Sequence, residues 1–294
     1  MAAVRHGFSG DRGRNLFPNW VRIVVSEIFE ALSKEAQFTR EMLGSGATQI
    51  RAANYAFKGV YFQAFTSLST GLERIGKLCL MLDHYIDHAG RFADSNYLKD
   101  EICHKILVIY KKAASVIANR SMSMTFLQDL DSPIHQGILS VLSEFAQGDR
   151  YSNINLLVGG KRQTDPVASW FRQVDKPLHE TRVGLRKKEP IGRNAVAVAE
   201  ILGPYAMVRH TSEEGKDITE IEEASYRTGV YEAVAPYRQL YVIQVIRWWV
   251  EVLCSLQHVA MNTGGDDIPY FSEIFALFYN DDSYIRTRKT WDRL

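Results

Sequence analysis

The hydrophobic residues between Arg51 and His88 recur at alternating intervals of three and four, and this pattern predicts one long α-helix. Since such intervals place side chains on one face of a helix, that face is expected to lie in the core. The stretch has no proline, and its polar residues fall off the apolar positions. The apolar positions are Phe57, Tyr61, Phe65, Leu68, Leu72, Ile75, Cys79, Leu82 and Ile86. Three glycines also lie in it, Gly59, Gly71 and Gly76, and each costs about 1 kcal/mol relative to alanine, which a close approach of another segment would explain.

The same period in other parts of the chain predicts further helices. The first is expected from Asn19, which can cap its N-terminus, to about Leu43, and the run Gly44-Ser45-Gly46 is expected to end it. Others are expected at 97–118, at 134–146 after Asp131-Ser132-Pro133, at 194–211 and at 230–261. No run of alternating strands is seen. The sequence therefore predicts an all-α fold without a sheet of more than two strands.

Composition places the chain among ordinary globular proteins. It has 294 residues, of which 46% are hydrophobic and 23% charged, and its net charge is +1. A charge so close to zero means that binding to a polyanion would depend on a local patch. The three cysteines, Cys79, Cys103 and Cys254, are far apart in apolar helical patterns, as expected for reduced thiols in a cytoplasmic protein.

The hydropathy of the chain predicts neither an export signal nor a membrane span. Residues 1–18 lack the apolar run of a secretory signal and predict a loose tail. The most apolar stretch, 240–261, contains Arg247, Glu251 and His258, which favours a buried helix over a membrane span. We therefore expect a cytoplasmic localisation and no membrane partner.

Sequence motifs for phosphate loops, dinucleotide binding, metalloproteases and serine nucleophiles are absent. His84 and His88 are four residues apart on one predicted helix face, but no further ligand stands at a defined spacing from them. No metal and no cofactor are therefore expected.

A basic segment spans residues 161–193, where nine Lys or Arg residues stand against four Asp or Glu residues. One interpretation is a solvated helix face and linker. The other is a surface that contacts RNA phosphates, in which Arg186, Lys187 and Lys188 would be the main cations.

The middle third of the chain, about residues 50–158, resembles the bacterial HEPN-like proteins. The segments that carry the resemblance are YFQAFTSLSTGLERIGKLCLMLDHYI, YLKDEICHKILVIYKKA and GDRYSNINLL, with Glu73 and Lys77 four residues apart, His104 in the second segment and Arg150 in the third. The resemblance implies an all-α helical bundle. It also implies a metal-independent RNase of toxin or antiphage-defence biology, often acting as a homodimer and controlled by an antitoxin or defence partner protein.

The family's nuclease signature is an Arg, four to six residues of any kind, and a His. A His can move the proton of a ribose hydroxyl, and an Arg can stabilise charge on the phosphate. Here Arg150 is followed by Asn155 where a His is expected, so His104 is the acid–base candidate that the resemblance offers. The pair Arg172 and His179, with six residues between, is the weaker alternative.

The resemblance also implies which residues would support binding. Tyr151, Asn153 and Asn155 would contact RNA or nucleotide beside Arg150, while Glu73 and Lys77 would form an ion pair that supports the site.

Two functional hypotheses and one structural hypothesis follow. The chain is an HEPN-like RNase, or a non-catalytic HEPN-like module that binds nucleotide, RNA or a protein partner, or a helical interaction protein. The missing His after Arg150 favours the second. The expected organisation is a tail at 1–18, an HEPN-like bundle with its N-terminal helix at 19–160, a basic connecting region at 161–193, and C-terminal helices at 194–294 packed on the bundle.

Overall fold

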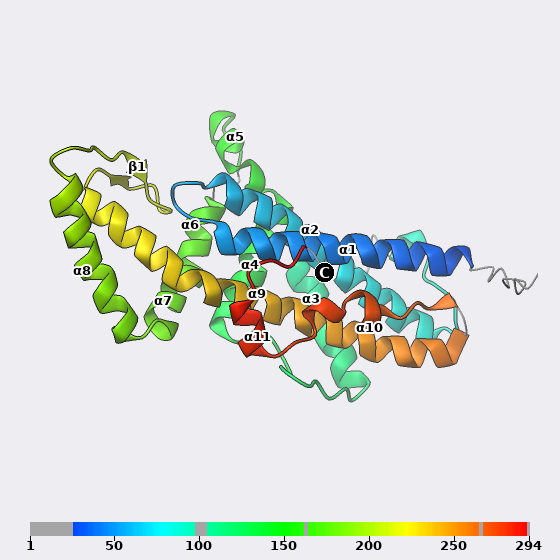
Figure 1. Cartoon of the computed structure of the whole chain (residues 1–294). Coiled ribbons are helices and arrows are strands. Elements are labelled where there is room, and N and C mark those ends of the chain that lie inside the picture. The colour runs from blue at the N-terminus through cyan, green and yellow to red at the C-terminus, as the bar shows by residue number, and fades with distance from the viewer. Residues whose placement is uncertain (1–25, 98–104, 162–163, 265–266, 293–294) are drawn as a thin grey trace, which may run out of the picture.

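The computed structural model describes residues 26–97, 105–161, 164–264 and 267–292 (Figure 1). The expected tail at 1–18, the Asn19 cap, His104 and Cys103 lie outside the described residues. Within these ranges the chain is helical, apart from loops and one two-stranded antiparallel sheet. The prediction of an all-α fold is therefore confirmed.

The first half of the chain holds the helices α1 (Glu27–Ala52), α2 (Gly59–Asp87), α3 (Ile106–Asn119) and α4 (Pro133–Gln147), then the 3-10 turn η2 (Asp149–Tyr151) and α5 (Ser152–Leu157). The second half holds α6 (Pro166–Trp170), the π-helix η3 (Phe171–Asp175), α7 (Lys176–Arg182), α8 (Leu185–Leu202), β1 (His210–Thr211), β2 (Asp217–Ile218), α9 (Ile221–Gly264), α10 (Phe271–Ile274), the 3-10 turn η5 (Ala276–Phe278) and α11 (Asp282–Thr287).

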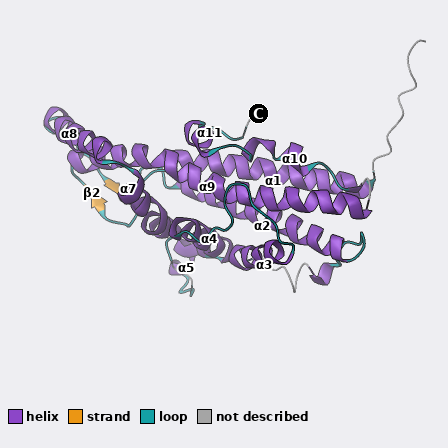
Figure 2. Ribbon diagram, turned by 90° about the horizontal axis from the view of Figure 1, so that it is seen from below, coloured by secondary structure: helices purple, strands orange, loops and turns teal. Residues whose placement is uncertain are grey.

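Helix α9 is the central element of the core. It runs beside α1 and α2 along the length of the molecule, and its middle is buried on several sides, including Trp248 and Trp249 (Figures 1 and 2). One continuous cluster of buried side chains joins α1–α4 to α9 and to the C-terminal helices. The helices after residue 193 therefore share a single core with the earlier ones.

The start of α4 follows the sequence rules for a helix N-terminus. Ser132 accepts a hydrogen bond from the backbone N–H of His135 through its Oγ, and Pro133 occupies the first turn, where no N–H is needed. Gly148 follows the last residue with a φ of 146°, a conformation that glycine adopts without strain. Both ends were predicted correctly.

The end of the first helix was predicted wrongly. Helix α1 passes through Gly44-Ser45-Gly46 and continues to Ala52, beyond the expected end at Leu43. A Cβ atom on Gly44 would lie 2.2 Å from the carbonyl oxygen of Trp291, and one on Gly46 would lie 2.6 Å from Leu68. These glycines permit close packing of neighbouring segments, and they do not terminate the helix.

The predicted helix over 51–88 is interrupted near its start. Residues 51 and 52 end α1, a loop follows, and α2 begins at Gly59, so Phe57 lies in the loop and is 68% exposed. From Tyr61 to Leu82 the apolar stripe is buried as expected. Gly71 and Gly76 lie against Leu43 and Ile109, which confirms that another segment packs closely at these two glycines.

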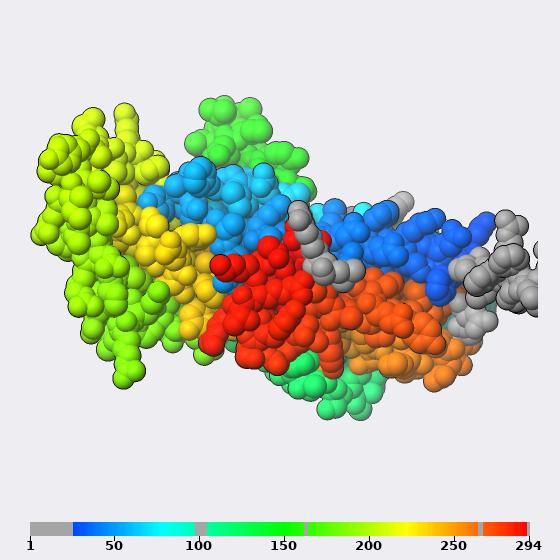
Figure 3. Space-filling view, viewed as in Figure 1, coloured from blue at the N-terminus to red at the C-terminus, as the bar shows by residue number. Residues whose placement is uncertain are grey.

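The segment 161–193, expected to connect two parts, is helical from residue 166 onward except at residues 183 and 184, between α7 and α8. It contains α6, η3, α7 and the first half of α8. Helix α8 packs against the N-terminal part of α9, and the hairpin β1–β2 lies at the same end of the molecule (Figure 1). Figure 3 shows α8 and α9 forming an arm that extends past the end of α2.

The C-terminal segment crosses the face formed by α1 and α9 (Figure 3). Trp291 is buried, and its backbone N–H donates to Thr48 Oγ1 at 2.8 Å. Arg247 of α9 donates to the carbonyl oxygen of Asn280 and to Asp282 Oδ1, at 2.5 and 2.8 Å. Among the described residues, no helix is both long and apolar enough to traverse a lipid bilayer.

Candidate functional site

A pocket of about 300 Å³ lies between η3 and α7 on one side and the first turns of α9 on the other. This volume is at the lower end of the range of about 300–1,000 Å³ that is typical of small-molecule sites. Aromatic and charged side chains share the lining: Phe171, Asp175, Lys176, His179, Glu213, Glu223, Tyr226, Arg227, Val230, Tyr231, Val234 and Arg238. The α9 members recur at intervals of three and four, so one face of this helix forms a wall of the pocket.

The buried side of the pocket is an ion pair between Asp175 and Arg238. Arg238 Nε donates to Asp175 Oδ1 at 2.7 Å and Nη2 donates to Oδ2 at 2.8 Å. The Tyr61 hydroxyl and the Trp170 indole N–H each donate to the same carboxylate at 3.1 Å. With four donors, the Asp175 carboxylate has no capacity left for a ligand.

The third nitrogen of the Arg238 guanidinium group also forms hydrogen bonds within the protein. This Nη1 atom donates to the carbonyl oxygens of Ile50 and Ala53, at 3.0 and 2.7 Å. These carbonyls belong to the C-terminal end of α1, whose last acceptors have no partner within the helix. Arg238 therefore joins α1, η3 and α9 and holds the pocket wall in place.

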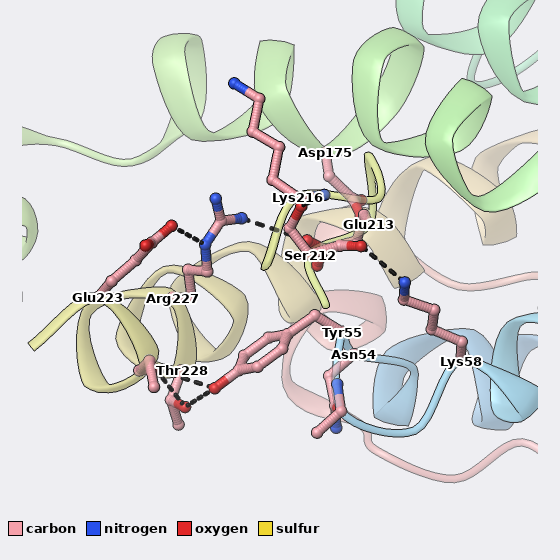
Figure 4. A network of polar contacts seen from close by, with 12 residues as sticks. Asn54, Tyr55, Lys58, Asp175, Ser212, Glu213, Lys216, Glu223, Arg227 and Thr228 are labelled. Atoms are coloured by element: carbon pink, nitrogen blue, oxygen red, sulfur yellow. Dashed lines mark hydrogen bonds and ion pairs between the residues drawn. The ribbon is translucent and has the colours of Figure 1, made fainter. Parts of the chain in front are cut away.

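Glu213, in the turn between β1 and β2, lines the pocket, and two cations contact this hairpin (Figure 4). Lys58 Nζ donates to the carbonyl oxygen of Ser212 at 2.6 Å. Arg227 contacts Glu223 Oε1 through Nε at 2.9 Å and reaches Glu213 Oε2 through Nη1 at 3.5 Å. Glu213 is 6% exposed, and burial raises the pKa of its carboxyl group.

His179 of α7 brings a titratable nitrogen to the pocket. Its Nε2 is buried and has no hydrogen-bond partner among the described residues. Burial lowers the pKa of His179 below its ordinary value, and the nearby positive charge of Lys188 lowers it further. The ring is therefore mostly neutral at pH 7 and can accept a proton.

Three cations lie just after the junction of α7 and α8, and a fourth, Lys176, belongs to the pocket lining. Lys176 lines the pocket and forms no ion pair with any described residue. Lys188 donates to the carbonyl oxygen of Glu180 at 3.4 Å, so its charge lies beside α7. Arg186 and Lys187 are exposed in the first turn of α8, where the helix dipole disfavours positive charge.

Comparisons of the chain with family models, curated proteins and solved structures gave no match. Function therefore has to be inferred from the site itself.

The segment favoured by the sequence resemblance lies away from this pocket. Arg150 is the middle residue of η2 and donates through Nη2 to the carbonyl oxygen of Ala146 at 2.9 Å, while its guanidinium lies 5.6 Å from the centre of the Tyr151 ring. Asn153 and Asn155 follow on α5, which projects from the body of the molecule (Figure 1). None of these residues lines the pocket, and Arg150 contacts no described histidine. Its proposed pairing with His104 falls outside the described residues.

Of the weaker alternative pair, Arg172 and His179, only one residue lies at the pocket. His179 lines it, whereas Arg172 is exposed and lies 3.9 Å from Glu214. Glu73 and Lys77 contact each other as predicted, with Lys77 Nζ 2.6 Å from Glu73 Oε1. They lie on α2 and line no part of this pocket.

The sequence analysis missed four charged residues of the pocket. It did not predict a functional role for Glu213, Glu223, Arg227 and Arg238. The spacing of Glu223 and Arg227 was a usable signal, because residues four apart meet on one face of a helix. The partnership of Asp175 with Arg238 had no such signal, since 63 residues separate them.

Proposed function

We propose that this chain is an HEPN-like RNA-targeting protein that binds single-stranded RNA at the α7–α8 junction and cleaves it without a metal, with His179 as the general base. The observation that carries the proposal is His179, which lines a pocket together with Lys176 and whose Nε2 has no hydrogen-bond partner among the described residues. The proposed active site is therefore at α7 and α8, whereas the sequence analysis placed Arg150 and His104 first.

Phosphate binding is supported by the charges at this junction. Lys176 lines the pocket, and Lys188 is close enough to His179 to lower its pKa. Arg186 and Lys187 are exposed in the first turn of α8, where the helix dipole disfavours positive charge. An RNA phosphate at that position would gain from the cations and from the free backbone N–H groups of the helix end.

The chemistry that fits these groups is transfer of the phosphate to the neighbouring ribose oxygen. Neutral His179 takes the proton of the 2′-hydroxyl, the 2′-oxygen forms a bond to phosphorus, and the bond to the 5′-oxygen breaks. The Lys176 ammonium group supplies the proton to that leaving oxygen. The products are a 2′,3′-cyclic phosphate and a 5′-hydroxyl.

The test is cleavage of a labelled single-stranded RNA by the purified chain in the presence of EDTA. His179→Gln should lower the rate by about 10²–10⁴-fold, the range typical of a lost general base, while binding stays within about twofold. His258→Gln is the matched control, because His258 is an exposed histidine at the far end of α9.

A binding module without catalysis is the second candidate function. It is favoured by the ion pair of Arg172 with Glu214, which holds the signature arginine outside the pocket. Binding of RNA by the wild-type chain with no cleavage products, and with His179→Gln unchanged in affinity, would establish this alternative. Absence of RNA binding would reject both.

A further inference from the structure

The three carboxylates of the pocket differ in how fully they are paired. Asp175 accepts four hydrogen bonds, and Glu223 accepts one of normal length from Arg227 Nε, at 2.9 Å. The only side chain of the described residues that pairs with Glu213 is Arg227, and that contact is long, at 3.5 Å. Glu213 is therefore the carboxylate with capacity for further donors.

An aromatic side chain with exposed surface lines the same pocket. Tyr226 is 41% exposed, so part of its ring can contact a ligand. Tyr231 has one face occupied by the guanidinium of Arg238, 5.7 Å from its centroid, and its hydroxyl donates to the carbonyl oxygen of Arg51. Tyr226 is thus the surface on which a planar ligand can stack.

We infer that this pocket selects guanine in the bound RNA, with the Glu213 carboxylate accepting two hydrogen bonds from the base and Tyr226 stacking on its face. This inference rests on the proposed function and names its substrate class. The cations at the α7–α8 junction would hold the phosphates on either side of the guanine.

The other bases lack the donors that this arrangement needs. The Watson–Crick edge of guanine presents N1–H and the N2 amino group side by side, and both can donate to one carboxylate. Adenine and cytosine present one donor next to an acceptor, and uracil presents one donor between two acceptors. An ionised carboxylate only accepts hydrogen bonds, so it repels the acceptors of these three bases.

The experiment measures the affinity of the wild-type chain, in EDTA on ice, for fluorescent uridine 10-mers with one central guanosine, inosine or adenosine. Guanosine should bind at least about fivefold more tightly than adenosine, as expected for a bidentate contact. Inosine lacks the N2 amino group and should fall between them. This comparison needs no variant, so it does not depend on how a variant folds.

Glu213→Gln is the variant test, because glutamine keeps the shape but accepts through one oxygen only. The guanosine preference should fall to within about twofold, while affinity for the all-uridine 10-mer is unchanged. Glu214→Gln is the matched control: the same change on the adjacent exposed residue should leave the preference intact.

Two results would overturn the inference in different ways. Equal affinity of the wild-type chain for the guanosine, inosine and adenosine RNAs would remove guanine selection and leave RNA binding in place. No affinity for any of them would remove the proposed function and the guanine selection with it.

Discussion

At the residue scale, the most constrained group is the guanidinium of Arg238. It is 2% exposed and donates four hydrogen bonds, two to Asp175 and one each to the carbonyl oxygens of Ile50 and Ala53. It also lies 5.4 Å from the centre of the Tyr61 ring. Removing one member of a buried ion pair leaves the other charge without compensation, which costs far more than the pair itself contributes. We therefore expect that a change in this pair lowers the stability of the fold, and that any effect on binding follows from that loss.

Arg238→Met should lower the free energy of unfolding by about 3–5 kcal/mol, because Asp175 would remain buried without its cation. Urea denaturation followed by circular dichroism measures the change. Arg74→Met is the control: Arg74 and Glu35 form a partly exposed pair at 2.7 Å, whose loss should cost about 0–1 kcal/mol. Similar losses for both variants would contradict the role given to Arg238.

A second residue-scale prediction concerns pH. His135 is buried, and its ring contacts Ser132 Oγ at 2.8 Å and Gln244 Oε1 at 2.9 Å. Burial lowers the pKa of His135 below 6.5. As pH falls below 6.5, the unfolded chain gains a proton here that the folded chain resists, so stability is present above that pH and decreases below it.

The free energy of unfolding should therefore fall between pH 7.5 and pH 5.5, and it should fall less in His135→Gln. Urea denaturation at both pH values measures the difference. The exposed His258→Gln variant should lose as much stability as the wild-type chain. A steeper pH dependence in His135→Gln than in the wild type would refute the assignment.

At the element scale, glycines inside helices have two different roles. Gly44 of α1 lies against the backbone of Trp291, whereas Gly192 of α8 has nothing within 4 Å of the position a Cβ would take. Gly44→Ala should destabilise the chain by about 1–3 kcal/mol through overpacking, since backbone cannot move aside as a side chain can. Gly192→Ala should instead stabilise it by up to about 1 kcal/mol, the helix preference of alanine.

Thermal unfolding of the two variants tests this contrast. The melting temperature should fall for Gly44→Ala and rise for Gly192→Ala. A rise in both would mean that the segment around Trp291 does not press on α1.

The element scale also shows what the sequence can and cannot predict. The apolar stripes identified α2, α4 and α9 because burial of one face depends on local spacing alone. The run Gly44-Ser45-Gly46 was misread, because the reason for its glycines, Trp291 and Leu68, comes from distant parts of the chain. Local rules treat glycine as a helix end, and tertiary packing overrides them here.

The same distinction explains the site. His179 and the cations of 161–193 were noticed because their residue types carry chemistry in any context. Arg150 was placed first, and the structure brings no described histidine to it. Its pairing with His104 lies outside the described residues and stays a prediction. The hairpin brings Glu213 to the pocket, and the ion pair with Asp175, 63 residues away in sequence, holds Arg238 there. No rule of local spacing predicts either placement.

At the scale of the whole molecule, positive charge is local. The net charge is +1, so RNA binding should depend on the cluster at the α7–α8 junction. Changing Arg186, Lys187 and Lys188 together to alanine should weaken binding to every RNA sequence. It should also reduce the slope of log affinity against log salt by up to about 2, at roughly 0.7 for each lost contact with single-stranded RNA.

Titrations at several salt concentrations measure that slope. The control replaces three exposed lysines elsewhere, Lys34, Lys111 and Lys289, by alanine and should leave it nearly unchanged. An equal effect of both triple variants would mean that the interaction is with overall charge and not with this junction.

The contact of Trp291 with α1 has a consequence for how the protein is made. Gly44 and Thr48 leave the ribosome well before Trp291, which contacts both and follows Thr48 by 243 residues. Until then this face of α1 has no partner, and the core around it cannot close. Contacts between such distant positions slow folding and lengthen the time for which apolar surface is exposed. We therefore expect nascent chains of this protein to bind chaperones along α1 until Trp291 has left the ribosome.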